Sequence, residues 1–166
     1  EGRMLLLEYP EFILINLYLP HGGRGKENLP YKLEAYHYLL SFLKQKLSGR
    51  KVILAGDFNV AHQEIDLARP KENQNSIMFT PKERKQIDQL VDLGFIDSFR
   101  HFHQEGGHYT WWPYGFNARE RNLGWRIDYI FVSLALKANL KEAFIQKEVA
   151  LSDHAPIGAV IDRVRE

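Results

Sequence analysis

The chain has 166 residues, no cysteine, and a formal net charge of +1 from 22 basic and 21 acidic residues. This length predicts one domain with a sizeable core. The lack of cysteine excludes disulfides, zinc–thiolate centres and cysteine nucleophiles, and the balanced charge excludes a globally basic nucleic-acid coat, so polyanion binding would need a local patch. No run approaches 18 apolar residues and no charged-then-apolar leader opens the chain, so we expect no membrane partner.

Two apolar runs, residues 4–7 and 12–19, begin the chain with Tyr9-Pro10-Glu11 between them. A turn signal between apolar runs predicts a hairpin, and the lack of clean alternation predicts that both of its faces are covered. The loop after the second run holds three side chains that can contact phosphate oxygens, Tyr18, His21 and Arg24. Its glycines are equally consistent with an ordinary loop.

The next elements are a helix and a strand. From Tyr31 to Leu47 the apolar residues recur at steps of three and four, which predicts an amphipathic helix that packs on a sheet and carries no chemistry. The run Val52–Ala55 predicts a strand buried on both faces, ending at Gly56.

Asp57 and Asn59 follow that strand directly. Because side chains two residues apart in an extended chain point to the same side, their carboxylate and amide should lie side by side at the strand's carboxyl end. Open α/β sheets bind ligands at that edge. Alternatively, the two residues only cap a turn.

The segment 64–78 is polar and irregular, which predicts a solvated loop, and Thr80-Pro81-Lys82-Glu83 is a capping box that predicts a second helix up to Gly94. Residues 95–102 predict a short strand or helical turn. His-x-His at 101 and 103, with His108 nearby, could ligate a transition metal, but no carboxylate or cysteine completes a recognisable ligand set.

Aromatic residues are dense at 109–114, and Arg119, Arg121, Trp125 and Arg126 follow. Aromatics interleaved with arginines suit stacking on bases or sugars beside phosphate contacts, although core aromatics beside a solvated loop would give the same pattern.

Residues 126–132 predict a strand whose one acidic residue, Asp128, needs a partner because burying an unpaired carboxylate is costly. Two more strands are predicted at 143–149 and 156–161. Ser152-Asp153-His154 lies between them, and histidine is the usual general acid, base or electrostatic partner near neutral pH. Ser-Asp-His is also a good turn.

These motifs occur in an order that resembles the exonuclease III family of apurinic/apyrimidinic endonucleases. The resemblance spans the chain, and its most specific parts are Gly-Trp-Arg-Ile-Asp-Tyr and Ser-Asp-His. The segments that carry it are Tyr18, Gly56–Asn59, Asp66-Leu67, Arg69–Asn73, Phe79–Arg84, Asp97–His101, Tyr109–Trp112, Gly124–Tyr129 and Ser152–Pro156.

The resemblance implies an α/β fold, the four-layer αββα sandwich, with residues 1–166 forming the C-terminal part of a single domain that here lacks its N-terminal repeat. It implies an Mg²⁺- or Mn²⁺-dependent hydrolase that cuts the phosphodiester 5′ to an abasic site in double-stranded DNA. A 3′–5′ exonuclease or 3′-phosphodiesterase activity is implied as well. Such a protein would act inside the cell, in the cytoplasm or nucleoid or in a nucleus.

The resemblance also implies roles for single residues. Asp57 would orient or deprotonate the attacking water, and Asp128 would hold His154 against the scissile phosphate. The implied catalytic residues are Tyr18, Asp57, Asn59, Asp128 and His154, and the implied metal ligands are Asp57, Asn59, Asp153 and His154. The implied DNA contacts are Arg24, which enters the groove; Lys71 and Asn73; Trp111, Trp125 and Ile127, the walls of a pocket for the flipped-out sugar; Arg126; and Phe116, an apolar wedge.

The sequence departs from the family in two ways. His21 stands where asparagine is common, and the family's first half, with its early asparagine and the glutamate that is the principal metal ligand, has no counterpart. Three interpretations therefore remain: part of an abasic-site endonuclease, a same-fold phosphodiesterase for another phosphate ester, or a catalytically incomplete DNA-binding fragment. We expect the chain to pair with the missing half or with itself.

Overall fold

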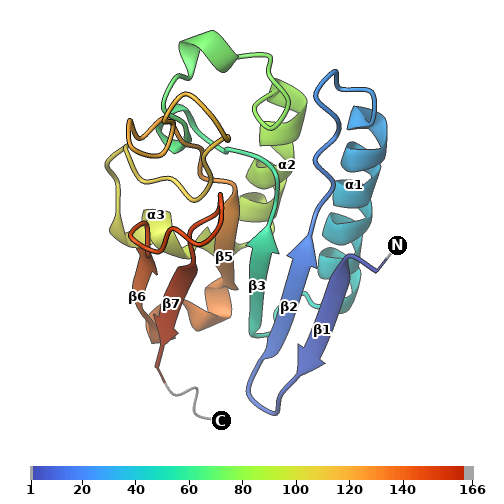
Figure 1. Cartoon of the computed structure of the whole chain (residues 1–166). Helices are drawn as coiled ribbons and strands as arrows, with labels where there is room; N and C mark the ends of the chain where they lie inside the picture. The colour runs from blue at the N-terminus through green and yellow to red at the C-terminus, as the bar shows by residue number, and fades with distance from the viewer. Residues whose placement is uncertain (1, 163–166) are drawn as a thin grey trace.

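The computed structural model describes residues 2–162, which form two β-sheets and three α-helices. The larger sheet has the order β1-β2-β3-β5-β4, and the smaller pairs β6 with β7 (Figure 1). Only β2 and β3 are parallel neighbours; the other pairs are antiparallel. The strands are β1 (Met4–Glu8), β2 (Ile13–Tyr18), β3 (Val52–Asp57), β4 (Phe95–Asp97), β5 (Asp128–Ser133), β6 (Leu140–Ile145) and β7 (Ile157–Ile161).

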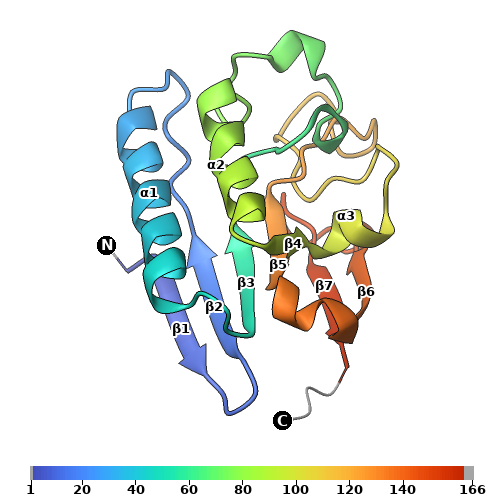
Figure 2. The same ribbon diagram turned by 180° about the vertical axis from the view of Figure 1, so that it is seen from behind.

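Two long helices, α1 (Leu29–Lys46) and α2 (Pro81–Asp92), cover one face of the larger sheet (Figure 2). The predicted capping box begins α2: the Thr80 hydroxyl accepts from the Glu83 backbone, and the Glu83 carboxylate accepts from the Thr80 backbone. The remaining helical segments are α3 (Ser98–Phe102) and the 3₁₀ turns η1 (Glu64–Asp66), η2 (Lys71–Asn73) and η3 (Leu134–Asn139). None of the helices in the described part is long and apolar enough to cross a membrane.

The main core lies between the larger sheet and its helices. Alternate residues of β2, namely Ile13, Ile15 and Leu17, point into it. Residues of β3, β5 and the helices complete it, including Leu54, Phe131, Tyr36 and Ile87. Full burial of each large apolar side chain contributes about 1.5–3 kcal/mol, so this layer fixes the sheet on which the polar loops stand.

The predicted hairpin is confirmed, but the expectation that both of its faces are covered is wrong. Every residue of β1 is exposed, and Leu5 retains 58% of its accessible surface. The reason is the position of the hairpin in the sheet. β1 is an edge strand, helices lie on one face only, and β7 packs on the other face near β5.

Two other predictions need adjustment. The strand expected at 143–149 is β6 at Leu140–Ile145, because Gln146 to Val149 turn back on themselves, the Val149 N–H donating to the Gln146 carbonyl at 3.0 Å. Residues 95–102 form both alternatives in succession, β4 and then α3. The α/β class is confirmed.

Candidate active site

Three polar side chains stand in a row across neighbouring strand ends. Tyr18 of β2 pairs with Asp57 of β3, and Asp57 pairs with Asp128 of β5. Residues directly opposite each other in a sheet point to the same face, so the three side chains share one face. The long irregular segments gather at this end of the sheet (Figure 1).

The turn after β3 fixes the Asp57 carboxylate. Gly56 has φ 142°, and a Cβ there would lie 1.9 Å from the Leu17 carbonyl oxygen, so only glycine fits. Asn59, itself left-handed at φ 52°, donates its backbone N–H to Asp57 Oδ1 (2.7 Å) and its side-chain amide to Oδ2 (3.1 Å). The Asn59 amide also donates to the Leu19 carbonyl at 2.9 Å. The turn and the predicted side-by-side placement are therefore both present.

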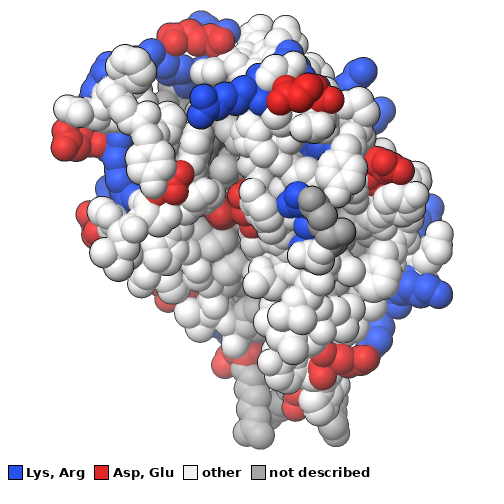
Figure 3. All heavy atoms as spheres, turned by 45° about the vertical axis from the view of Figure 1, so that its right-hand side comes forward, with Lys and Arg blue, Asp and Glu red and all other residues white. Residues whose placement is uncertain are grey.

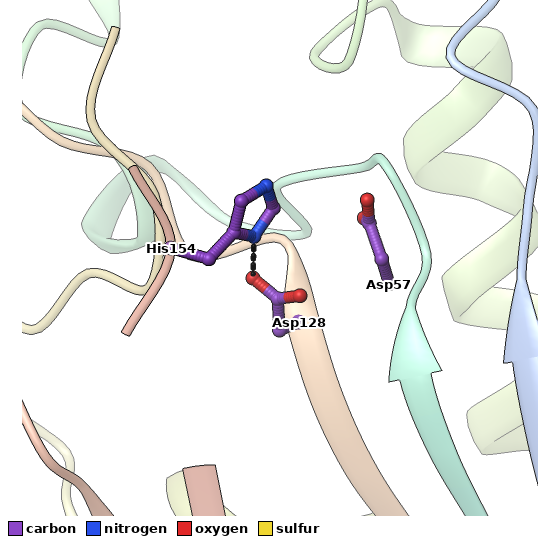
Figure 4. A group of neighbouring side chains, drawn as sticks. All are labelled: Asp57, Asp128 and His154. Carbon is purple, nitrogen blue, oxygen red and sulfur yellow. Dashed lines mark hydrogen bonds and ion pairs between the residues drawn. The ribbon is translucent and has the colours of Figure 1, made fainter. Parts of the chain in front are cut away.

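Asp128 has the partner that its burial requires. Its Oδ2 lies 2.9 Å from Nδ1 of His154, and because a carboxylate only accepts, His154 donates from Nδ1. Figure 4 shows the second ring nitrogen turned away from Asp128, with Asp57 facing the same space from the end of β3. The contact that the resemblance implied between Asp128 and His154 is therefore present.

Asp57, Asp128 and His154 could hold a metal ion, since one ligand atom from each lies within 4.8 Å of the others. Among the described residues no other group of three such side chains meets this spacing, so the alternative site built on His101, His103 and His108 does not form. Asp153, predicted as a ligand, also lies outside the group. Its carboxylate instead accepts from the Trp111 indole at 3.0 Å and from the Ser152 hydroxyl at 3.1 Å.

Burial and neighbouring charge shift the pKa values of Asp57 and His154. Burial, followed by repulsion from Asp128, raises the pKa of Asp57 to about 7, although the Asn59 N–H opposes the rise. The hydrogen bond to Asp128 raises the pKa of His154 despite partial burial. Asp57 can therefore exchange a proton near neutral pH, which is the property of a general base.

An open cavity of about 510 Å³ holds several of the predicted DNA-contacting side chains. Trp111 and Trp125, both half-buried, line it together with Arg24. The predicted third wall, Ile127, does not line it. Ile127 is 2% exposed and packs beneath the two tryptophans in an apolar cluster, so it supports the cavity from behind.

Arg126 is wrongly predicted as a DNA contact. It is 1% exposed, and its guanidinium lies 2.8 Å from Asp66 and 2.7 Å from Asp97, stacked over the Tyr129 ring. Burial would raise the pKa of Asp66, but Arg126 and Arg100 outweigh it and lower that pKa. Arg126 therefore belongs to a buried ion-pair network and is not accessible to a phosphate.

The other predicted contacts are accessible to different degrees. Tyr18 is exposed, with the Arg3 guanidinium over its ring, and Phe116 is 91% exposed at φ 53° in a left-handed turn. Lys71 is exposed, whereas half-buried Asn73 hydrogen-bonds locally to the Arg69 carbonyl and the Ser76 hydroxyl. On the face drawn in Figure 3, acidic side chains are sunk in a central groove, and the upper edge carries basic side chains with some acidic ones among them.

One contributor was missed because α1 was expected to carry no chemistry. Lys32 is fully buried, and its ammonium donates to the Asn59 carbonyl at 2.6 Å and to Glu83 at 2.5 Å. It therefore ties the turn that holds Asp57 to α2. A sequence signal existed, because Lys32 lies four residues before Tyr36, on the same helix face as a core residue.

The model of the Endonuclease/Exonuclease/phosphatase family matches residues 5–154. The chain belongs to this family. Within it, the chain is 42% identical to an exodeoxyribonuclease of Bacillus subtilis (strain 168) and 41% identical to the DNA repair nuclease APEX1 of Danio rerio. These matches take in 98% and 95% of this chain but 65% and 51% of the relatives.

Solved structures of the Endonuclease/Exonuclease/phosphatase type give the same result. The 3′-5′ exonuclease NExo from Neisseria meningitidis superposes with a TM-score of 0.91 at 34% identity. An AP endonuclease from Archaeoglobus fulgidus superposes with a TM-score of 0.90 at 29% identity. Each match takes in 97% of this chain and 65% of the other. The chain thus spans just under two thirds, or less, of these relatives.

Proposed function

We propose that the chain is the C-terminal part of a single-domain DNA repair nuclease that hydrolyses the phosphodiester 5′ to an abasic site, with 3′–5′ exonuclease or 3′-phosphodiesterase activity as a second reaction. The observation that carries the proposal is the row of Tyr18, Asp57 and Asp128, with His154 hydrogen-bonded to it. The names of the relatives, exodeoxyribonuclease and DNA repair nuclease, support it.

The side chains suit hydrolysis at phosphorus. Asp57, with its pKa near 7, accepts the proton of the attacking water. His154, held at Nδ1 by Asp128, presents its other ring nitrogen to a non-bridging phosphate oxygen, and the Tyr18 phenol donates to the same group. The P–O bond to the 3′-oxygen breaks as the water oxygen bonds to phosphorus, and the departing oxygen takes a proton from solvent.

The donor set fits a divalent cation that prefers oxygen ligands. Asp57 and Asp128 supply carboxylates at the required spacing, and Asn59 supplies an amide beside Asp57. Mg²⁺, or Mn²⁺ in its place, would offset the charge that develops on the phosphate. His154 could join as a ligand through its second ring nitrogen, in place of its phosphate contact, while Nδ1 keeps its bond to Asp128. A further carboxylate, the family's glutamate, would come from the part of the relatives that this chain does not span.

We propose that the cavity next to this row receives the abasic sugar. Trp111 and Trp125 offer apolar walls, Arg24 reaches into the groove of the duplex, and Phe116 holds the unstacked step open. Lys71 and Asn73 would contact the backbone. The site of action would be intracellular, wherever DNA is repaired.

Two alternatives stay open. A same-fold phosphodiesterase for another phosphate ester would keep the Asp57 row but have no use for the tryptophan-lined cavity. A catalytically incomplete DNA-binding fragment would use the cavity and leave the row idle, which the shortage of metal ligands favours.

The deciding experiment is cleavage of a duplex with one abasic analogue, with Mg²⁺ or with chelator. The purified chain is tested alone and mixed with a polypeptide that carries the N-terminal portion of a relative. We expect Mg²⁺-dependent incision 5′ to the analogue in the mixture. Binding without incision in either sample would favour the fragment, and no preference for abasic over intact duplex would favour the other phosphodiesterase.

A further inference from the structure

Asp128 and His154 must be held together by something other than strand pairing. Asp128 begins β5 in the larger sheet, whereas His154 lies in the loop before β7 of the smaller sheet. Their 2.9 Å hydrogen bond joins a side chain of the larger sheet to one in a loop next to the smaller sheet, so a small relative shift of the two would lengthen it. A segment that contacts both β5 and the loop of His154 is therefore needed to keep this distance.

Residues 110–112 form that segment, and Thr110 contacts both the start of β5 and the loop that holds His154. The Thr110 hydroxyl accepts from the backbone N–H of Asp128 at 3.1 Å and of Ile127 at 3.0 Å. The Thr110 carbonyl accepts from the backbone N–H of Ala155, the residue after His154, at 2.7 Å. Thr110 is fully buried, so these bonds do not compete with water.

The geometry points to Thr110 as a positioning residue that sets the separation of Asp128 from His154. This role rests on the proposed function of the Asp128–His154 pair and adds a residue that has no part in the reaction itself. Most neighbouring contacts in this segment are made by backbone groups: Trp111 pairs with Trp125 and His154, and Trp112 donates to the Asp153 carbonyl at 3.0 Å. The Trp111 indole adds a side-chain contact on the His154 side, to the Asp153 carboxylate at 3.0 Å. The side chain at 110 is therefore the replaceable part of the connection to β5.

Threonine suits this position for two reasons. Its hydroxyl can accept two hydrogen bonds, and its branched Cβ restricts the rotamer, so the oxygen stays aimed at β5. Valine has nearly the same shape and no acceptor, so Thr110→Val would leave the N–H groups of Ile127 and Asp128 unpaired in a buried place. Thr110→Ser keeps the acceptor.

The test is the Nδ1 proton of His154, observed by NMR in the purified 166-residue chain. A proton shared between imidazole and carboxylate resonates far downfield and exchanges slowly, so its position and exchange report the Asp128–His154 bond directly. We expect Thr110→Val to move this resonance upfield or to raise its exchange rate about tenfold, and Thr110→Ser to leave it nearly unchanged. Thr110→Cys, with a weaker acceptor, should fall between them and serves if the valine variant does not fold.

The matched control is Thr80→Val, because Thr80 is the only other threonine in the chain and caps α2 away from this pair. It should lower stability without moving the His154 proton. An unchanged His154 proton in folded Thr110→Val or Thr110→Cys would overturn the inference, as would an equal change in Thr80→Val.

Incision measured on the mixture of the two polypeptides provides a separate readout. Thr110→Val should lower kcat about 10- to 100-fold with little change in KM, and serine should restore it. If no variant or parent cuts DNA but the His154 proton still responds as expected, the proposed function fails and the positioning role stands. If the parent cuts DNA and the proton does not respond, the positioning role fails alone.

Discussion

Two neighbours have opposite effects on the pKa of Asp57. Asn59 donates to both of its oxygens and favours the charged form, whereas burial and Asp128 disfavour it more strongly. The outcome is a carboxylate fixed in direction but easily protonated. Both properties suit a group that manages the proton of a water molecule.

Asp57→Asn should lower the turnover of the incision-competent enzyme by roughly 10²- to 10⁴-fold while leaving abasic-DNA binding largely intact. The amide keeps the shape and can accept from one of the two Asn59 donors, but it cannot accept the water proton. Single-turnover cleavage and equilibrium binding on the same duplex separate the two effects. Near-normal turnover would remove Asp57 from the mechanism.

Asp57 should also make stability depend on pH. Its folded pKa, about 7, lies above the usual aspartate value of 3.8, so between these pH values the folded state binds more protons than the unfolded state. Stability therefore falls as pH rises through this window and levels off above it. His154, whose folded pKa is also raised, adds stability at low pH that is lost as pH rises through that pKa.

Asp57→Asn should consequently stabilise the chain at pH 8 by about 1 kcal/mol or more, and have little effect near pH 4. Urea unfolding at the two pH values, in chelator so that no cation neutralises the site, measures the difference. A gain that is equal at both pH values would mean that protonation of Asp57 is not its cause.

Asp57 and Arg126 show which properties of a single residue can be predicted from the sequence and which cannot. Asp57 could be predicted because strand period and a glycine turn, both local features, determine where it points. Arg126 could not, because its partners Asp66 and Asp97 are 60 and 29 residues away, and nothing local distinguishes an arginine in a buried ion network from one at a surface. Thr110 was missed for the same reason, whereas Lys32 had a local signal, its place on the same helix face as Tyr36.

At the scale of elements, the sequence predicted those with a strong period or cap. Both long helices and the strands that became β1, β2, β3 and β5 are confirmed, because periodicity and capping are local. Whether β1 is buried and where β6 begins and ends depend on which other elements pack against them. These are properties of the tertiary structure. The same distinction applies to the cavity, which the loops after β2, η2 and α3 build together.

We expect substitutions at the cavity to separate recognition of the lesion from general affinity. Trp125→Ala removes an apolar wall, so discrimination between abasic and intact duplex should fall about tenfold, with intact-duplex binding nearly unchanged. Arg24→Ala should weaken binding to both duplexes. It should also reduce the slope of log affinity against log salt concentration by about one, the value for one phosphate contact. Binding curves for both duplexes at two salt concentrations test both statements. Equal losses for both duplexes in Trp125→Ala would count against a pocket role.

At the scale of the whole molecule, the larger sheet has one covered face and one partly open face. Strand register places Leu5, Leu7 and Leu14 together on the face opposite the helices, in line with Tyr18 and therefore with the candidate active site. The smaller sheet packs near β5 and leaves the β1–β2 hairpin open. An apolar face continuous with a polar site is what a second layer of a sandwich would cover.

The open face leads to the last prediction. The relatives are longer than this chain, which spans 65% of the Bacillus subtilis exodeoxyribonuclease, and an exposed apolar edge strand promotes association. We expect the purified chain to self-associate, and we expect a polypeptide with the N-terminal portion of a relative to suppress this and restore Mg²⁺-dependent incision. Leu5→Lys with Leu7→Lys should reduce self-association and also weaken pairing with that polypeptide, whereas the matched change Tyr38→Lys, on exposed α1 surface, should do neither. Light scattering and the incision assay measure the two outcomes. A monodisperse monomer that cuts abasic DNA at a rate typical of enzymes would show that the open face needs no partner and that the ligands present suffice.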